Sequence, residues 1–158
     1  MSLAADILSA CRTKGWRIAT AESCTGGMVA AALTDIPGSS DVFERGFITY
    51  TNTAKIEMLG VSPATLEAVG AVSQEVALEM AQGALKHSDA ELAVAITGIA
   101  GPGGSDFKPE GRVCFAIAGK GAPSSAETVE FGALGRDKVR NAARNHALTL
   151  LLEAASHK

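Results

Sequence analysis

The amino-acid sequence predicts a single α/β domain, residues 1–158, built as a three-layer α/β/α sandwich with a mixed sheet. Helical and strand-like patterns alternate along the chain, which is typical of this fold class. Leu92–Ile96 is a continuous apolar run, as expected for a central strand that is covered on both faces. Arg112–Ala118 and Glu127–Phe131 have the pattern of an antiparallel hairpin, so the sheet is expected to be mixed.

The chain is expected to begin with a helix over residues 2–14, where apolar residues repeat at helical spacing until Gly15 ends it. A buried strand over Trp16–Ala21 follows, and an alanine-rich helix over Met28–Leu33 comes after a tight turn. Phe43–Thr51 is rich in β-branched and aromatic residues and predicts the second strand.

Two short helices are expected in the middle of the chain. Asn52 or Thr53 is expected to cap the first, Ala54–Leu59, which Gly60 ends. Ser62-Pro63 is expected to open the second, since proline is well tolerated in the first turn of a helix.

Two longer helices complete the prediction. One begins at residues 73–75 and the other extends from Arg136 to Ala155. Each has an apolar face that would cover the sheet. In the first helix this face is formed by Val76, Met80, Gly83 and Ala84. In the second it is formed by Val139, Ala143, His146 or Ala147, Leu150 and Ala154.

Composition excludes several classes of function. The net charge is −3 and aromatic residues make up 4% of the chain, so neither phosphate-backbone binding nor base stacking is expected, and no nucleic-acid partner. The three cysteines form no CxxC pair, which argues against a disulfide framework or a zinc site and favours the reducing cytoplasm. The N-terminus lacks the pattern of a secretory signal, and no apolar run reaches the roughly 18 residues of a membrane span, so no membrane partner is expected.

A turn with unusual chemistry follows the first strand, at Glu22-Ser23-Cys24-Thr25-Gly26-Gly27. A hydroxyl here would stand at the start of a helix, whose N–H groups can hold an anion or a developing oxyanion. Ser23 is therefore a candidate nucleophile, although a serine at this place can also be a simple helix cap. Cys24 is interpreted as a small buried residue, because a reactive thiolate needs an electropositive and partly exposed setting.

The second candidate segment contains Tyr50 at the end of a strand and Lys55 near the start of a helix. A helix N-terminus and partial burial would both lower a lysine pKa, as a lysine general base requires. An ordinary surface lysine and a core tyrosine remain the alternative. Since none of the three histidines, His87, His146 and His157, is well placed to serve a serine, a serine–lysine arrangement is the favoured enzymatic hypothesis.

Two further segments are candidates for ligand binding. The loop Gly98–Ser105 follows Thr97 and is rich in glycine, which allows the backbone to approach a ligand closely. Residues 108–111 either close over this loop or form a surface turn. Arg136 and Arg140 lie in a basic cluster at the start of the last helix, which could bind a phosphate or be a solvated face.

Taken in order, these segments resemble the CinA C-terminal-domain family, which includes stand-alone nicotinamide-nucleotide amidases. The resemblance covers about residues 5–153. It rests on the motifs AESCTGG at 21–27, Tyr50-Thr51-Asn52 with Lys55 and Leu59-Gly60-Val61, Gly70-Ala71-Val72-Ser73, Thr97–Gly104, and Lys108-Pro109-x-Gly111.

The resemblance implies hydrolysis of the carboxamide of nicotinamide mononucleotide to nicotinic acid mononucleotide and ammonia, in NAD recycling and without a metal or cofactor. It implies Ser23 as the nucleophile, Lys55 and Tyr50 as proton-handling residues and Thr97 as a further catalytic residue. Either the turn after Ser23 or the Thr97-Gly98 segment would supply the oxyanion N–H groups. The residues expected to bind substrate are Thr25, Gly26, Gly27, Asn52, Gly98, Gly101, Gly103, Gly104 and Arg140.

The chain departs from the family pattern at one place. Members often have Gly-Asp-Arg-x-x-(Ile/Val)-Arg before the last helix, whereas this chain has Gly135-Arg136-Asp137-Lys138-Val139-Arg140, so Arg140 transfers more safely than Arg136. The larger N-terminal domain of full-length CinA proteins is absent from this sequence, and its activity is not expected.

Three alternatives in function and assembly stay open from the sequence. Beside the nicotinamide-nucleotide amidase, one rival hypothesis is a non-catalytic binding module linked to competence or DNA damage. Another is an amidase that acts on a different amide. A homo-oligomer is expected only because most oligomers of soluble proteins are homo-oligomers.

Overall fold

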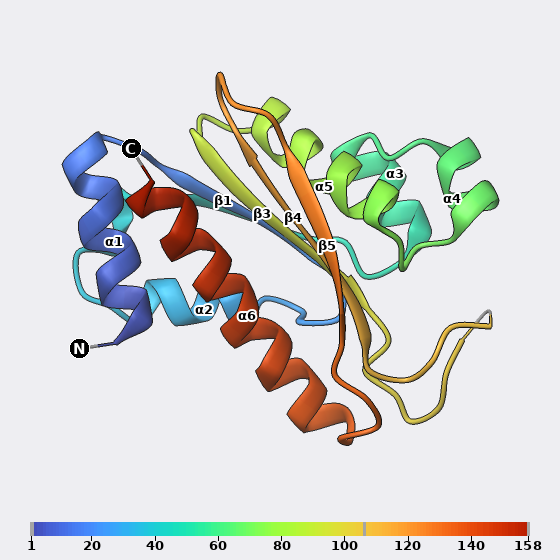
Figure 1. The fold of residues 1–158 in the computed structure, drawn as a ribbon. Coiled ribbons are helices and arrows are strands. Elements are labelled where there is room, and N and C mark those ends of the chain that lie inside the picture. The colour runs from blue at the N-terminus through green and yellow to red at the C-terminus, as the bar shows by residue number, and fades with distance from the viewer. Residues whose placement is uncertain (1, 106, 158) are drawn as a thin grey trace.

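The computed structural model describes residues 2–105 and 107–157, which form a mixed sheet covered by helices on both faces (Figure 1). The described strands are β1 (Ile18–Glu22), β2 (Phe43–Ile48), β3 (Leu92–Gly98), β4 (Arg112–Gly119) and β5 (Ser125–Glu130). Their order in the sheet is β2-β1-β3-β4-β5. The first three are parallel, while β4 and β5 are antiparallel to their neighbours, which confirms the mixed sheet.

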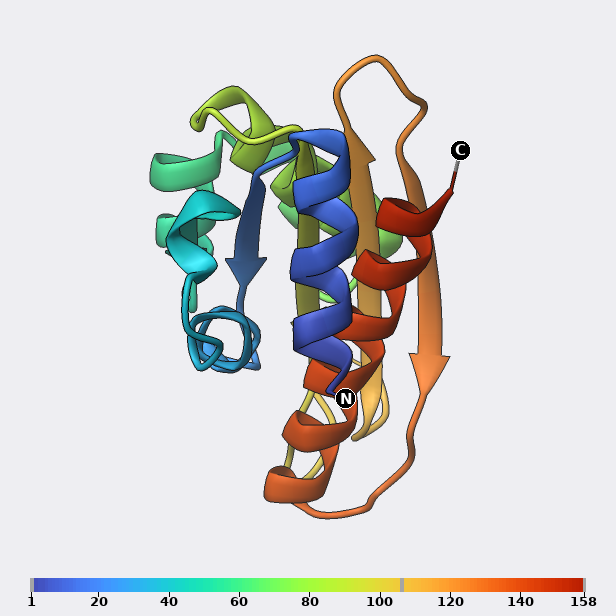
Figure 2. The same ribbon diagram turned by 90° about the vertical axis from the view of Figure 1, so that its left-hand side faces the viewer.

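Two layers of helices enclose this sheet (Figures 1 and 2). One layer contains α1 (Leu3–Lys14), α2 (Met28–Thr34) and α6 (Arg136–Ser156), and the other contains α3 (Asn52–Leu59), α4 (Pro63–Val69) and α5 (Gln74–Lys86). A single 3₁₀ turn, η1 (Ser39–Asp41), precedes β2. The three-layer prediction is confirmed, and no helix of the described chain combines the length and hydrophobicity needed to cross a membrane.

Local sequence signals explain where several helices begin and end. The Ser2 hydroxyl accepts a hydrogen bond from the Ala5 N–H at the start of α1, and Gly15, at φ 69°, ends the helix. Ser73 caps α5 in the same way by accepting from the Val76 N–H. These boundaries agree with the sequence prediction because each depends on a capping side chain or on a left-handed glycine.

Several predicted details are wrong. The residue that caps α3 is Thr51, not Asn52 or Thr53, because the Thr51 hydroxyl accepts from the Ala54 N–H. The second strand therefore ends at Ile48 instead of Thr51. The first strand begins at Ile18 and continues through Glu22. The buried side of α6 contains Leu148, Leu151 and Ala155 in place of Leu150 and Ala154, because α6 packs against α1 as well as the sheet.

The two faces of the sheet carry side chains of different size. Towards α3, α4 and α5, the central strands present alanines that pair across the sheet in two rows, Ala19–Ala93–Ala118 and Ala21–Ala95–Ala116. Towards α1, α2 and α6 they present mainly larger groups, such as Ile18, Val94, Ile96 and Phe115.

The alanine-lined face allows the helices above it to approach closely. Within that layer, a Cβ atom at Gly83 of α5 would lie 2.0 Å from the carbonyl oxygen of Leu59 in α3, so only glycine fits there. This contact fixes α3, the helix that carries Lys55, against α5.

Candidate functional site

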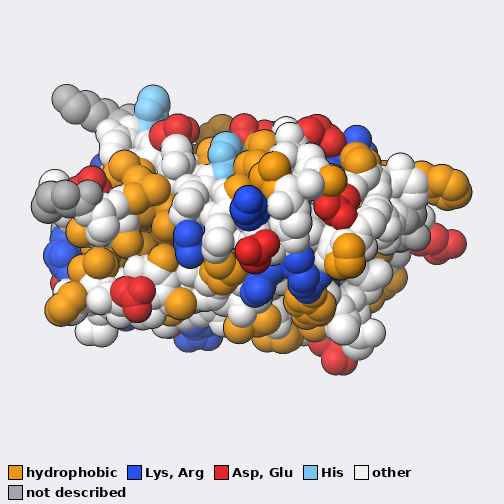
Figure 3. Space-filling view, turned by 90° about the horizontal axis from the view of Figure 1, so that it is seen from below, with side chains coloured by type: hydrophobic (Ala, Val, Ile, Leu, Met, Phe, Trp, Pro, Cys, Tyr) orange, Lys and Arg blue, Asp and Glu red, His pale blue; other side chains and the backbone are white. Residues whose placement is uncertain are grey.

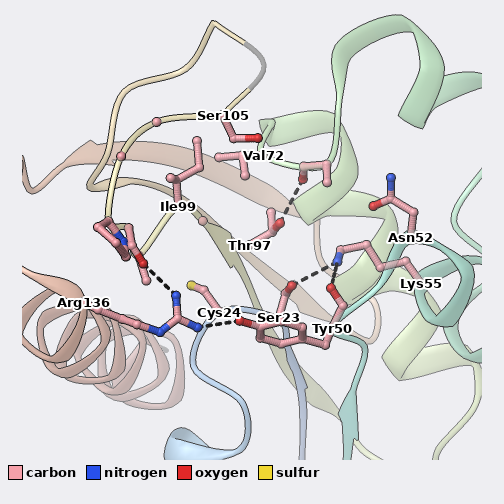
Figure 4. Close-up of a pocket in the computed structure, with 17 residues that line it drawn as sticks. Ser23, Cys24, Tyr50, Asn52, Lys55, Val72, Thr97, Ile99, Ser105 and Arg136 are labelled. Atoms are coloured by element: carbon pink, nitrogen blue, oxygen red, sulfur yellow. Dashed lines mark hydrogen bonds between the residues drawn. The ribbon is translucent and has the colours of Figure 1, made fainter.

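A pocket of about 340 Å³ opens where β1 and β3 end (Figure 4). Its walls come from the turn after β1, the β2–α3 connection, the α4–α5 connection, the glycine-rich loop after β3, and the first residue of α6. The carboxyl ends of parallel strands are the usual site of ligand binding in open α/β sheets, and the volume lies within the roughly 300–1,000 Å³ typical of small-molecule pockets.

Ser23 and Lys55 meet at the base of this pocket. The Lys55 ammonium lies 3.0 Å from the Ser23 Oγ and also donates to the carbonyl oxygens of Thr49 (2.9 Å) and Tyr50 (3.4 Å). Lys55 is only 1% exposed and forms no salt bridge among the described residues. Burial lowers its pKa from 10.5 to about 8, with a smaller opposing effect from the Cys24 thiol. The amine therefore loses its proton much more readily than a surface lysine does.

The position of Lys55 follows from the local structure of α3. The helix starts directly after its Thr51 cap, and Lys55 and Leu59 lie one turn apart on the buried side. Since Leu59 packs at Gly83 of α5, the same helix face turns the lysine towards the sheet and Ser23. Lys55 thus reaches a residue 32 positions away in the chain.

Glu22 is a buried carboxylate next to Ser23, with only 1% of its surface exposed. It accepts hydrogen bonds from the Thr25 hydroxyl (2.6 Å) and from the N–H groups of Val29 and Ala30 (both 3.0 Å). Because successive residues of an extended chain point to opposite sides, Glu22 faces α2 while Ser23 faces Lys55. No sequence motif predicted a role for Glu22, although an acidic residue directly after a buried apolar strand was a usable signal.

The Glu22 carboxylate occupies the start of α2, so the N–H groups of Val29 and Ala30 in that helix are not available to a ligand. The opposite side of the same turn is held by Arg140, which donates to the carbonyl oxygens of Cys24 (3.0 Å) and Thr25 (3.4 Å). Arg140 thus supports the turn from another element. Four residues that were expected to bind substrate do not line the pocket: Thr25, Gly26, Gly27 and Arg140.

The other expected binding residues do line the pocket, namely Asn52, Gly98, Gly101, Gly103 and Gly104. Thr97 also lines it, and its hydroxyl donates to the Ala71 carbonyl oxygen at 2.9 Å, which leaves its lone pairs as acceptors. Lys108 donates to the carbonyl oxygens of Val69 and Val72, at 2.6 Å each. It therefore ties the glycine-rich loop to the wall that Ala71 and Val72 form.

Arg136, rather than Arg140, is the arginine that lines the pocket. Its guanidinium donates to the Gly101 carbonyl oxygen (2.8 Å) and to the Tyr50 hydroxyl (2.6 Å). The Tyr50 hydroxyl is thus directed towards Arg136, while the Tyr50 carbonyl faces Lys55 (Figure 4). On the surface seen from below, lysine and arginine side chains gather over α6, which contains Arg136, Lys138, Arg140 and Arg144 (Figure 3).

The remaining reactive side chains do not form a second catalytic group. Cys24 lines the pocket but is 5% exposed, and burial raises the pKa of its thiol to about 11. His146 pairs with Glu127 and packs on Phe115, on the α6 side of the sheet, and His87 caps the end of α5. Among residues 2–105 and 107–157, no cluster of three or more His, Cys, Asp or Glu could hold a metal ion.

Comparisons with known proteins agree on one family. The family model described as CinA C-terminal domain matches residues 1–155. The chain is 49% identical to the nicotinamide-nucleotide amidohydrolase PncC of Escherichia coli, covering 96% of this chain and 92% of that protein. It is 56% identical to the nicotinamide-nucleotide amidohydrolase PncC of Enterobacter agglomerans, covering 75% and 73%.

A solved structure and the lengths of other relatives complete the comparison. The crystal structure of the competence/damage inducible protein CihA from Agrobacterium tumefaciens superimposes with a TM-score of 0.93 at 48% identity, covering 98% of this chain and 94% of that one. Other curated relatives are much longer, since the chain spans 34% and 25% of the length of two of them.

Proposed function

The chain belongs to the CinA C-terminal domain family, and on this premise we propose that it hydrolyses the carboxamide of nicotinamide mononucleotide to nicotinic acid mononucleotide and ammonia. The observation that carries the proposal is the buried contact of 3.0 Å between Lys55 Nζ and Ser23 Oγ. The names of the two PncC relatives support the choice of substrate.

In the first step, the Ser23 hydroxyl attacks the carboxamide carbon while neutral Lys55 accepts its proton. With a pKa of about 8, roughly a tenth of the lysine is neutral at pH 7, which is enough for a general base. The transfer is direct, because the Tyr50 hydroxyl is engaged with Arg136. Tyr50 contributes its backbone carbonyl, which helps to orient the lysine amine.

The negative charge that develops on the amide oxygen needs N–H donors. We assign them to the Thr97-Gly98 segment, since Gly98 lines the pocket whereas Gly26 and Gly27 do not. One such donor contributes about 3–4 kcal/mol to transition-state stabilisation in well-studied hydrolases. Thr97 can accept a hydrogen bond from the carboxamide NH₂ group, because its own proton is donated to Ala71.

In the second half of the reaction, protonated Lys55 returns its proton to the departing nitrogen, and ammonia leaves. The nicotinoyl group is then held as an ester on the Ser23 Oγ. A water molecule loses a proton to Lys55 and attacks the ester carbon, and the serine oxygen takes the proton back. The acid product retains its ribose phosphate and can re-enter NAD synthesis, and we place this recycling reaction in the cytoplasm.

The test is an assay of ammonia release from nicotinamide mononucleotide by the purified protein. Replacement of Ser23 by alanine is expected to abolish release, because water alone cannot substitute for the held nucleophile. Thr13→Ala removes a hydroxyl from an exposed position of α1 and is the matched control, expected to keep wild-type activity. Full activity in Ser23→Ala would rule out the proposed nucleophile. A wild-type protein that hydrolyses other amides but not nicotinamide mononucleotide would show that the proposed substrate is wrong.

A further inference from the structure

Arg136 is the second cation of the pocket, and it lies on the side of Ser23 opposite Lys55 (Figure 4). Lys55 and Arg136 are the two charged side chains among the described lining residues, and no carboxylate is among them. Lys55 is buried and engaged with Ser23. Arg136 is therefore the cation that remains for a negatively charged part of a ligand.

The guanidinium of Arg136 is held from two walls of the pocket. Tyr50, from the β2–α3 connection, and Gly101, from the loop after β3, accept one hydrogen bond each. These bonds use two of the five N–H donors of the group, so the others stay available to a ligand. An arginine remains charged at every pH at which Lys55 titrates, and its planar fork suits phosphate oxygens.

The other arginine of the cluster has a different environment. Arg140 bonds to the carbonyl oxygens of Cys24 and Thr25 behind the nucleophile turn, and it does not line the pocket. The two residues are one helical turn apart on α6, yet only Arg136 lines the cavity.

We propose that Arg136 determines specificity by binding the phosphate group of the substrate, with Tyr50 positioning its guanidinium. The inference rests on the proposed amidase function. A nucleotide carries its carboxamide at one end and its phosphate at the other. If the carboxamide carbon lies at the Ser23 Oγ, the phosphate extends away from Lys55, towards Arg136.

The first experiment measures kcat/KM for nicotinamide mononucleotide and for nicotinamide riboside, which has the same carboxamide and no phosphate. In Arg136→Gln, the ratio of the two values is expected to fall about 10- to 100-fold, mainly through KM for the nucleotide, because a hydrogen-bonded charge pair is lost. Arg136→Lys is expected to restore part of the ratio. Lys138→Gln, which removes the same charge from an exposed position two residues away, is expected to keep it.

An equal fall for both substrates would overturn the proposal, since Arg136 would then only hold the pocket walls together. A second measurement, calorimetric titration with ribose 5-phosphate, is independent of turnover. Binding is expected for the wild type and Lys138→Gln and absent in Arg136→Gln, with ribose as the phosphate-free control. Equal binding by Arg136→Gln, or no binding by the wild type, would also overturn the proposal.

The two experiments separate the phosphate site from the amidase function. If the wild type releases no ammonia, but ribose 5-phosphate binds and depends on Arg136, the amidase function fails and the phosphate site stands. If nicotinamide mononucleotide is hydrolysed but neither readout depends on Arg136, the function stands and the specificity proposal fails.

Discussion

The two faces of the central sheet differ in the size of their side chains and in what they hold in place. The face towards α3, α4 and α5 is lined by alanines, including Ala95, whereas the face towards α1, α2 and α6 is lined by larger residues such as Val94 and Phe115. Small side chains bring α5 close to the sheet, and α5 in turn fixes α3 at Gly83. The proposed base, Lys55, therefore belongs to the closely packed layer.

Neighbouring residues of the turn after β1 point to opposite faces of the sheet. Glu22 faces the layer of large side chains and anchors the turn to the start of α2. Ser23 faces the alanine side and Lys55. We infer that the α1–α2–α6 layer supplies stability and anchorage, while the α3–α5 layer supplies the proposed proton chemistry. The following changes test that division.

The largest effect is expected for Lys55→Met, which keeps much of the side-chain volume and removes the amine. Ammonia release is expected to fall by about 10³-fold, within the usual contribution of a general base. The melting temperature is expected to be unchanged or higher, because a buried ammonium is removed. Activity assays and calorimetry on the same preparation check both values.

The matched change on the other face is Val94→Ala. It is expected to lower the free energy of unfolding by about 2–3 kcal/mol through a cavity and to leave kcat within about twofold. If Lys55→Met kept its activity, or if Val94→Ala lost it while folded, the division between the two layers would be wrong.

The second test is the pH dependence of kcat/KM, which is expected to change about tenfold per pH unit below pH 8. Since the proposed base is neutral Lys55, kcat/KM should rise with a slope of one up to about pH 8 and then level off. Initial rates at constant ionic strength measure this profile. A flat profile from pH 6 to 9 would contradict a lysine base.

The same pKa also predicts how stability changes with pH. Native Lys55, at about 8, loses its proton before the unfolded lysine at 10.5 does, so the unfolded state binds more protons between these values. The free energy of unfolding of the wild type should therefore rise relative to Lys55→Met as the pH increases through this window. Urea titrations of both proteins provide the measurement.

The third test removes the charge of Glu22 and keeps its shape. In Glu22→Gln, an NH₂ group replaces one of two oxygens that each accept from a backbone N–H of α2, so the N–H of Val29 or of Ala30 is left without an acceptor. A loss of about 1–3 kcal/mol in stability is expected. We also expect kcat to fall about tenfold at nearly constant KM, because the Ser23 turn loses its anchor.

Thr25→Val is the milder control for this change, since it removes one donor and leaves both backbone bonds to Glu22 intact. Its kcat should lie between those of the wild type and Glu22→Gln. A Glu22→Gln protein that lost stability but kept its full kcat would show that Glu22 stabilises the fold without positioning the nucleophile.

A moderate effect on rate is expected for Ala95→Val, which enlarges a side chain on the closely packed face. Overpacking should cost about 1–3 kcal/mol and move α5 outward, and α3 with it. Because Val94→Ala acts at the next residue on the opposite face, the pair compares the two layers directly. A several-fold lower kcat is expected for Ala95→Val alone, and equal rates in both variants would contradict the coupling of α5 to Lys55.

Local patterns were sufficient for most of the fold. The two ends of α1 and the start of α5 follow from Ser2, Gly15 and Ser73, whose capping roles depend only on neighbouring residues. The three-layer arrangement and the mixed sheet also follow from the order of the elements. The buried side of α6 was harder to predict, because it depends on contacts with both α1 and the sheet.

The candidate site was predictable in its segments and less so in its individual contacts. Ser23, Tyr50, Lys55 and Thr97 all line one pocket, as their positions near strand ends suggest. The sequence pattern favoured Arg140 over Arg136, yet only Arg136 lines the pocket, because residues one helical turn apart differ only in what the tertiary structure places beside them. For the same reason it did not indicate that the Tyr50 hydroxyl bonds to Arg136, 86 positions away.

Local sequence signals specify the order of helices and strands, the turn that carries Ser23, and the helix that carries Lys55. These features depend on hydrophobic periodicity, capping and glycine conformation, which act over a few residues. The tertiary structure alone decided the 3.0 Å contact between the two side chains and the lowered pKa of the lysine. Both require close packing over the alanine face, since a side chain loses water only when distant segments enclose it.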